Sequence, residues 1–483
     1  MVEDAGSTKL EDEADGAAAE KTHPDPPAVT DDAQLRKLAI RGSILEMIGY
    51  GANQGLRLVS SLVLSRLLFP EAYGLTAIVS AYLYGMWMLS DLGVRDCVMR
   101  SQRGDDIRYL NTAWTLHVVR GFGLCAVAAA IAWPIARLYG KPVLAELLAV
   151  SSLSLLANSF GSTALFTLAR QVRRGPLVLI EVVSKMAALA VMITWAVLSP
   201  TVWALVAGSL TSSVVTTAAS HMLRVGYRNG FAWDRSAARE LRDFGKWVLG
   251  SSGLTFAAEE GDRLLLGYFL PLAAMGVYSI ASILSVAFGA IIVRLTFSVV
   301  YGVLTTAARE RPDDLGRLYY ASRLRLDLLA QPALGAVAVL APIVVSILYD
   351  ERYAAAGWML QLLCFRVALS SLHHPASTCL VARGEPKQAM IGNAWRAVVT
   401  WVGVPIGFHL FGVKGAIWAL VASELAVLLV FNLALHRRRI FRVRRELIPV
   451  GLFLGGLIVG SAVRSAAQPL TATVIEWSHS IRK

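Results

Sequence analysis

The segments WALVAGS at residues 203–209 and WALVASE at residues 418–424 repeat one another within a single chain of 483 residues. Chance could produce such a match in so apolar a protein, so the evidence for a duplication has to come from the flanking sequence. Further landmarks recur in the same order: SRLLFPEAYGLTAIVSA resembles LGYFLPLAAMGVYSIAS, ARLYGKP resembles SILYDER, and LAR resembles VAR. Because order and spacing are kept, the pattern predicts a duplication into two halves.

The composition places both halves in a membrane. Hydrophobic residues make up 55% of the chain, charged residues only 17%, and the mean hydropathy is +0.55. Soluble domains carry about 25% charged residues. Apolar runs of roughly 20 residues, each long enough to cross about 30 Å of hydrocarbon, follow one another through most of the chain. The sequence therefore predicts an all-α polytopic membrane protein.

The polar and turn-forming residues between the apolar runs predict six helices in each half and one extra C-terminal helix, within an expected range of 12–14 transmembrane helices. The predicted helices lie near residues 44–66, 74–95, 112–137, 143–169, 176–198 and 201–223, then 247–269, 274–305, 325–348, 354–382, 388–410 and 413–435, and finally 447–465.

Basic residues alternate from one connection to the next. The connections after even-numbered helices hold 26 Lys and Arg, against 4 after odd-numbered ones. The positive-inside rule then predicts a cytoplasmic N-terminus. Because six is even, the two six-helix bundles start on the same side and are parallel repeats around a central cavity, an architecture typical of alternating-access transporters.

The chain divides into six predicted parts. The first 34 residues hold ten acidic and two basic residues, which predicts a disordered cytoplasmic tail. The basic excess elsewhere is attributed to topology and contact with anionic membrane lipids, not to nucleic acid. The parts are 1–34 (tail), 35–224 (N-terminal lobe), 225–246 (cytoplasmic linker), 247–436 (C-terminal lobe), 437–465 (basic segment and extra helix) and 466–483 (second tail).

Charged residues inside the apolar runs are candidate functional residues, since burying them in lipid is costly. A cavity lined by lone cations would favour an anionic ligand, and arginine suits bidentate contact with phosphate. Candidates for such an anion site are Arg57, Arg120, Lys185, Arg294, Arg366 and Arg396, together with Asn53. Lys185 has an alternative partner in Glu181, four residues earlier on one helix face.

Acidic residues suggest a second role. Glu259, Asp262 and Arg263 share one face of a predicted helix near the middle of the membrane, and Glu424 lies in the second WALVA helix. We expect Glu424 to pair with an arginine. Ion coupling through these four residues is a further hypothesis.

Small residues mark places of close approach or interruption. IGYGANQGLR (48–57) aligns with LGSSGLTFAA (249–258), and paired interrupted helices at equivalent positions indicate a transporter's binding site. The alternative is close helix packing through Gly51 and Gly55. The last predicted helix has two further GxxxG spacings, Gly451/Gly455 and Gly456/Gly460.

Motifs of enzymes and metal sites are missing from the sequence. No GxxxxGK[ST], HExxH, GxSxG or DxD occurs, so we expect neither enzymatic activity nor a cofactor. The adjacent His373 and His374 point to different helix faces and do not predict a metal site. The four cysteines have no CxxC spacing and are expected to be buried apolar residues.

Several of these stretches resemble one family. LSRLLFPEAYGLTAIVSAY…LSDLG, ARQVRRGPLVLIEV and FGKWVLGSSGLTFAAEEGDRLLLGYFL…MGVYSIA are similar to the Wzx-type oligosaccharide flippases of the multidrug/oligosaccharidyl-lipid/polysaccharide (MOP) exporter superfamily. The resemblance covers about residues 35–440. It implies two six-helix lobes around a central cavity, no enzymatic cofactor, and flipping of a polyprenyl-pyrophosphate-linked oligosaccharide.

The resemblance also implies a place and partners. We expect the bacterial inner membrane, a role in exopolysaccharide, capsule or O-antigen (lipopolysaccharide) biosynthesis, and partnership with a polysaccharide polymerase and a chain-length regulator. Two alternatives remain at this point. One is a cation-coupled multidrug exporter of the same superfamily, and the other is a non-transporting scaffold of a polysaccharide assembly complex.

Overall fold

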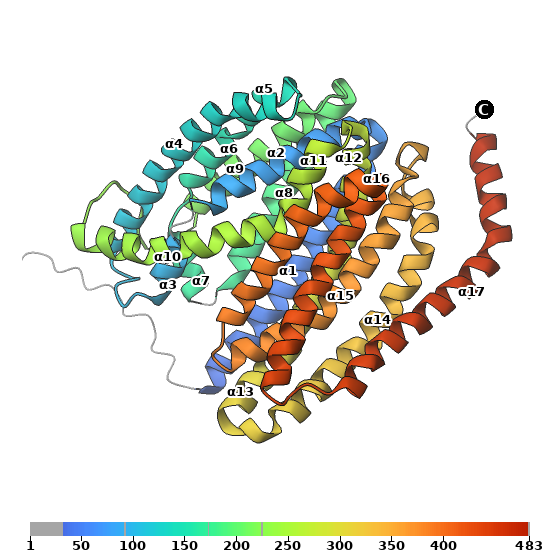
Figure 1. Cartoon of the computed structure of the whole chain (residues 1–483). Helices are drawn as coiled ribbons and strands as arrows, with labels where there is room; N and C mark the ends of the chain where they lie inside the picture. Colours follow the sequence, from blue (N-terminus) through green and yellow to red (C-terminus); the bar gives the residue numbers. More distant parts are fainter. Residues whose placement is uncertain (1–31, 91–92, 172, 224–225, 482–483) are drawn as a thin grey trace, which may run out of the picture.

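The computed structural model describes residues 32–90, 93–171, 173–223 and 226–481, and every regular element within them is a helix (Figure 1). The predicted all-α fold is therefore confirmed. The predicted acidic tail lies almost entirely outside the described residues, as do residues 482–483.

The first half contains α1 (Asp32–Leu67), α2 (Pro70–Met88), α3 (Val94–Arg100), α4 (Ile107–Leu138), α5 (Val143–Ser151), α6 (Leu153–Ser159), α7 (Ala164–Arg170), α8 (Arg174–Leu198) and α9 (Trp203–His221). The remainder contains α10 (Arg235–Glu259), α11 (Gly261–Phe269), α12 (Leu272–Leu295), α13 (Gly302–Glu310), α14 (Leu315–Leu348), α15 (Ala356–Ala382), α16 (Lys387–Arg437) and α17 (Val443–Ile481). A π-helical turn (Thr296–Tyr301) joins α12 to α13.

Six of the described helices are by themselves long and apolar enough to cross a membrane, and one bent pair would add a seventh. One of the six, α16, is 51 residues long, and its helical geometry fails at Phe411 and Gly412, where the φ of Gly412 is +62°. It therefore comprises the two predicted helices 388–410 and 413–435. The other predicted spans are also helical, but they are shorter or carry more polar side chains.

Corresponding helices of the two halves pack against each other. Both α2 and α12 begin beside a proline, Pro70 or Pro271, and carry a glycine in the next turn. A Cβ on Gly74 would collide with the carbonyl of Leu272, and one on Gly276 would collide with the carbonyl of Pro70. The contact is reciprocal, as expected for two repeats related by a pseudo-twofold axis.

Residues 143–169 form three short helices instead of the single predicted helix. The segment Val143–Ser159 and helix α7 meet at 59°. Serine hydroxyls compete with the helical ladder at the earlier break, between α5 and α6: Ser152 donates to the Ala149 carbonyl at 2.6 Å, and Ser154 donates to the Ser151 carbonyl at 2.6 Å. Such local bonds to the preceding turn bend helices.

The predicted interruption of the first helix at 48–57 is wrong, because α1 runs unbroken through it. The alternative, close packing at Gly51 and Gly55, is also wrong, since a Cβ at either position would meet open space. In the second half the helix breaks at Glu260, between α10 and α11, just after the predicted stretch 249–258. The break therefore falls within the acidic cluster.

The extra helix α17 packs along α14 (Figure 1). Only one of its GxxxG pairs is used: a Cβ on Gly456 would meet the backbone of Pro332, and one on Gly460 would meet Ala336. A Cβ on Gly451 or Gly455 would meet nothing within 4 Å. The helix also continues to Ile481, through most of the predicted C-terminal tail.

A buried ion pair fixes the start of α17. Arg323 of α14 is 1% exposed, and its guanidinium lies 2.7 Å from the carboxylate of Glu446. The same guanidinium lies 3.1 Å from Asp327. Together with the glycine contacts, this pair attaches the thirteenth predicted helix to the second half.

Candidate functional site

A basic cavity lies between α1, α6, α8 and α9. Its volume is about 420 Å³, within the range of about 300–1,000 Å³ that is usual for small-molecule sites. Two cationic side chains, Arg57 and Lys185, line it. The remaining polar lining consists of an amide and hydroxyl groups: Asn158, Ser60, Ser209, Ser212, Ser213 and Thr216. The Ser213 hydroxyl donates to the Ser209 carbonyl at 3.2 Å, and the other groups can donate hydrogen bonds to an anion.

Arg57 is exposed, and no ion pair involves it in the part of the chain that the structure describes. The charges of Glu260 and Arg263 in the second half act on it, so it lies toward the interface between the halves. Lys185 differs, because its ammonium lies 3.1 Å from the Glu181 carboxylate. The alternative local partner of Lys185 is thus the one observed. Arg57 remains as the cation available to an anionic ligand.

The hydroxyl groups of this cavity were not among the sequence-based candidates. They come mainly from α9, where the run SLTSSVVTT at residues 209–217 is rich in Ser and Thr. Hydroxyl groups at 209, 212, 213 and 216 share one helix face because their spacing follows the helical repeat. That periodicity is the signal that could have found them.

A smaller cavity of about 120 Å³ adjoins α1, α8 and α12. Asn53 and Arg294 line it. Asn53 is 6% exposed, and its buried Oδ1 has no hydrogen-bond partner. The guanidinium of Arg294 lies 4.0 Å from the centroid of the Tyr50 ring. Arg294 therefore has an aromatic partner, although it still faces a polar cavity.

A buried network of charges occupies the second half. The Arg366 guanidinium lies 2.9 Å from Asp262 and 3.3 Å from Glu424. The other oxygen of Glu424 lies 3.0 Å from Arg396 and 2.8 Å from His373. The network links α11, α15 and α16.

This network corrects part of the predicted anion site. Arg366 and Arg396 are not lone cations, because Asp262 and Glu424 neutralise them within the protein. The pairing of Glu424 with an arginine is as expected. The sequence predicted the sign of these charges and their approximate depth in the membrane. It did not predict the packing of α15 against α16, which brings the opposite charges together.

Arg120 also differs from the prediction. Its guanidinium donates to the Trp87 carbonyl at 2.9 Å and to the Ser90 hydroxyl at 2.9 Å. It therefore binds the C-terminal end of α2, where helix carbonyls lack partners within the helix. This role is structural and lies outside the basic cavity.

The remaining acidic candidates have local partners. Arg263 pairs with Glu260 at 2.7 Å. The Tyr84 hydroxyl lies 3.4 Å from Glu259, which is exposed. Tyr278 donates to Asp262 at 2.7 Å. Their participation in ion coupling stays a prediction.

One contact between the halves involves the end of α11. The Tyr139 hydroxyl donates to the Leu264 carbonyl at 3.0 Å. The Lys141 ammonium donates to the Gly267 carbonyl at 2.8 Å and reaches that of Leu270 at 3.4 Å. A cation of the first half thus caps the carbonyl end of a helix in the second half, where cations are favoured.

A matching contact involves the end of α1. The hydroxyls of Tyr349 and Ser61 lie 3.0 Å apart. Arg352 donates to the Ser65 carbonyl at 3.1 Å and to the Leu68 carbonyl at 3.5 Å. The two contacts are made by the repeated segments ARLYGKP and SILYDER, and each binds the first membrane helix of the other half. We call them the two clamps: Tyr139 and Lys141 on α11, and Tyr349 and Arg352 on α1.

The comparisons with known proteins agree with this architecture. The family described as "Polysaccharide biosynthesis protein" matches residues 63–358. "Lipopolysaccharide biosynthesis protein WzxC" of Escherichia coli (strain K12) is 22% identical, over 79% of this chain and 77% of that protein. "Succinoglycan biosynthesis transport protein ExoT" of Rhizobium meliloti (strain 1021) is 24% identical, over 73% of this chain and 71% of that protein.

Solved structures share the fold. "Lipid II flippase MurJ, inward closed conformation" superimposes with a TM-score of 0.72 at 13% identity, over 88% of this chain and 93% of that one. An inward-facing "multidrug resistance MATE family transporter of the MOP superfamily" gives a TM-score of 0.59 at 17% identity, over 80% and 94% of the two chains. The family match covers more than half of the sequence. This chain therefore belongs to the polysaccharide biosynthesis protein family, as the resemblance to Wzx-type flippases predicted.

Proposed function

We propose that this multi-pass membrane protein flips a polyprenyl-pyrophosphate-linked oligosaccharide repeat unit from the cytoplasmic to the outer leaflet, for surface polysaccharide biosynthesis. The observation that carries the proposal is the basic cavity, where Arg57, which forms no ion pair with any described residue, lies among hydroxyl groups. Guanidinium and hydroxyl groups suit a pyrophosphate, which offers many acceptor oxygens and negative charge. Family membership and the names of WzxC and ExoT support the substrate class.

The position of the clamps supports a mechanism of alternating access. Both clamps join the two halves at the ends of α1 and α11, opposite the end where the basic connections gather. Under the positive-inside rule the basic end faces the cytoplasm. The N-terminus then lies in the cytoplasm, and the clamps hold the outer end of the transport path closed until the substrate has bound from inside.

The buried network in the second half is the proposed coupling element. Two carboxylates face two guanidinium groups there, so an external cation could bind Glu424 only if Arg366 or Arg396 moved away. A change in these pairings would alter the contacts between α11, α15 and α16. A polysaccharide polymerase and a chain-length regulator are the proposed partners, because a flipped repeat unit must then be polymerised.

The test is transport by the full-length protein in vesicles. A fluorescent undecaprenyl-pyrophosphate disaccharide is placed in both leaflets, and a membrane-impermeant quencher reports exchange. We expect Arg57→Gln to slow flipping by about 10- to 100-fold, the loss typical of charge-assisted hydrogen bonds. Arg57→Lys should be intermediate, because it keeps the charge without the bidentate geometry.

Arg325→Gln is the matched control, since Arg325 is an exposed arginine of α14 outside both cavities. It should flip at the wild-type rate. Wild-type flipping by Arg57→Gln would overturn the anion site alone. No flipping by the wild-type protein, with or without proton or sodium gradients, would overturn the function itself.

A further inference from the structure

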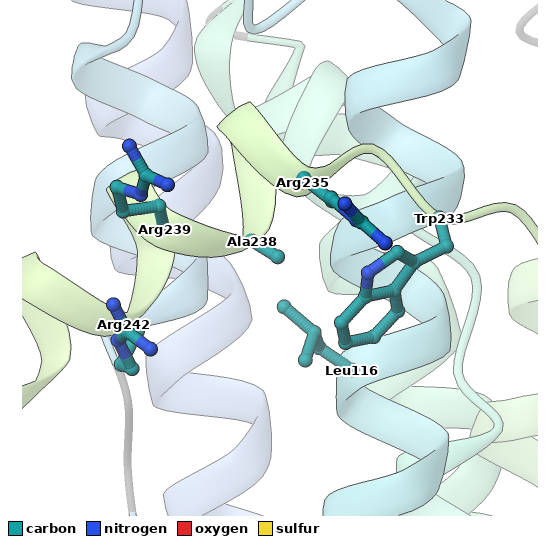
Figure 2. Close-up of a pocket in the computed structure, with 6 residues that line it drawn as sticks. All are labelled: Leu116, Trp233, Arg235, Ala238, Arg239 and Arg242. Atoms are coloured by element: carbon teal, nitrogen blue, oxygen red, sulfur yellow. The ribbon is translucent and has the colours of Figure 1, made fainter.

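A second basic cavity lies at the surface, away from the proposed transport path. It has a volume of about 410 Å³ and is formed by the start of α10, the residue before its cap, and α4. Figure 2 shows Trp233 and Arg235 on one side of the opening, Arg239 and Arg242 on the other, and the apolar Leu116 and Ala238 between them.

The three arginines lie on one face of α10, since positions 235, 239 and 242 follow the helical repeat. No ion pair or hydrogen bond occupies their guanidinium groups within the described ranges, although carboxylates such as Glu240 stand on the same helix. The face of α10 that carries Ala237 and Leu241 is fully buried against α3 and α4. The basic face is therefore held outward by packing.

The wall of the cavity is rigidly built. Three backbone N–H groups of the linker donate to side chains of α4: Gly230 to Asn111 at 3.1 Å, Ala232 to Thr115 at 3.1 Å, and Asp234 to Thr112 at 3.0 Å. These bonds anchor the backbone on either side of Trp233 and directly before Arg235.

The cap of α10 reinforces the wall. Asp234 accepts a hydrogen bond from the Ser236 N–H at 2.8 Å, and Arg103 binds its other oxygen at 2.7 Å. The Arg103 guanidinium and the Ser236 hydrogen bonds hold the pKa of Asp234 well below its usual range. Asp234 thus stays charged and committed to Arg103, and it leaves the three cavity arginines without a carboxylate partner.

Aromatic and apolar residues place this cavity at a membrane surface. Trp233 is 60% exposed and Phe231 is 71% exposed, as is typical of residues at the headgroup level. From Leu116, the exposed side chains of Val119 and Phe122 continue along the membrane helix α4. A charged mouth thus leads directly onto an apolar track.

From this arrangement we infer that the cavity binds the phosphate headgroup of an anionic phospholipid, with an acyl chain lying along α4. Arginine pairs bind phosphate oxygens in a fixed geometry, while a tryptophan ring covers the glycerol region. The bound lipid would fasten the linker between the halves to the membrane surface. The inference does not depend on which substrate is transported.

Binding can be measured on the full-length protein in detergent micelles by native mass spectrometry during titration with dioleoylphosphatidylglycerol. We expect the triple variant Arg235→Gln/Arg239→Gln/Arg242→Gln to bind this lipid about a hundredfold more weakly, since each basic residue near a membrane surface contributes roughly fivefold. Dioleoylphosphatidylcholine should bind weakly to both proteins. Wild-type affinity in the triple variant would overturn the inference.

The matched control is Arg437→Gln/Arg439→Gln/Arg444→Gln, which removes three arginines of the junction between α16 and α17, at the same end, whose guanidinium groups have no ion pair with any described residue. It should bind phosphatidylglycerol as the wild type does, and equal weakening would overturn the site in favour of diffuse surface charge. Trp233→Ala should weaken binding severalfold with all arginines present. Displacement of phosphatidylglycerol by equimolar farnesyl diphosphate would overturn the assignment in favour of a polyprenyl ligand.

Discussion

Ser209 and Glu424 hold the same place in the two halves but lie in different surroundings. Ser209 lines the basic cavity with other hydroxyl groups. Glu424 is 3% exposed and binds two arginines and a histidine. The first half therefore keeps Arg57 available for a ligand, whereas the network of the second half neutralises Arg366 and Arg396. The duplicated helices have diverged into an open site and a closed network.

Glu424 should be far more important to stability than its neighbours. Glu424→Gln removes one charge and leaves Arg366 and Arg396 under-compensated in a buried site, which typically costs about 3–5 kcal/mol. We expect a large fall in the unfolding midpoint in detergent. Glu259→Gln, at an exposed residue with one long hydrogen bond, should change the midpoint little.

A double variant separates the ion pair from general damage. Glu424→Gln/Arg396→Gln should be less destabilised than the sum of the two single variants, because the pair is removed together. Additive losses would contradict a direct coupling between the two side chains.

For single residues, the sequence predicted the charge and the approximate depth in the membrane, but not the ion-pair partners. Arg57 and Arg366 are both arginines inside apolar runs, and nothing local distinguishes them. Only the packing of α11 and α16 around α15 gives Arg366 two carboxylates. Arg57 faces a cavity instead, because α1, α8 and α9 place no carboxylate against it.

Helix α17 offers a test at the scale of an element, because its two GxxxG pairs lie on different faces. Gly456→Leu or Gly460→Leu would push a side chain into the backbone of α14. Such overpacking typically costs about 1–3 kcal/mol. We expect faster proteolysis at the connection before α17 and a lower unfolding midpoint.

The other pair supplies the control. Gly451→Leu and Gly455→Leu introduce the same side chain where no atom lies within 4 Å. Both should leave the proteolysis rate and the midpoint unchanged. Equal effects of all four substitutions would show that helix propensity, rather than contact with α14, is being measured.

The helices were largely predictable because apolar runs in a membrane have few alternatives to helix. The positions at which the helices break were less predictable. The break between α5 and α6 lies at a serine hydroxyl that bonds to the preceding backbone, while the glycines of 48–57 look like an interruption but lie in a continuous helix. Whether a small residue breaks a helix, packs it or faces a cavity depends on neighbours distant in sequence.

At the scale of the whole molecule, the duplication reappears as two equivalent clamps. ARLYGKP supplies Tyr139 and Lys141, whereas SILYDER supplies Tyr349 and its last residue, Arg352. Each half thus caps the first membrane helix of the other. The order of the repeated segments was predictable from the sequence. That each segment contacts the other half was not, because this depends on how the two halves pack together.

If the clamps close the outer end, as we propose, opening it requires both clamps to release. Lys141→Gln/Arg352→Gln removes the cation from each while leaving the tyrosines in place. Loss of one charge-assisted hydrogen bond shifts an equilibrium by about tenfold or more, so the double variant should favour the outward-open state more than either single variant. A cysteine at Leu62, which packs against the core beneath the clamps, reports this opening in a protein without its native cysteines. We expect a membrane-impermeant maleimide to label it at least about tenfold faster in the double variant.

Arg137→Gln/Lys414→Gln is the control, because these cations stack on Trp133 and Trp358 within their own halves. A wild-type labelling rate in the clamp variant, or an equal increase in the control, would contradict a role for the clamps in closing the outer end.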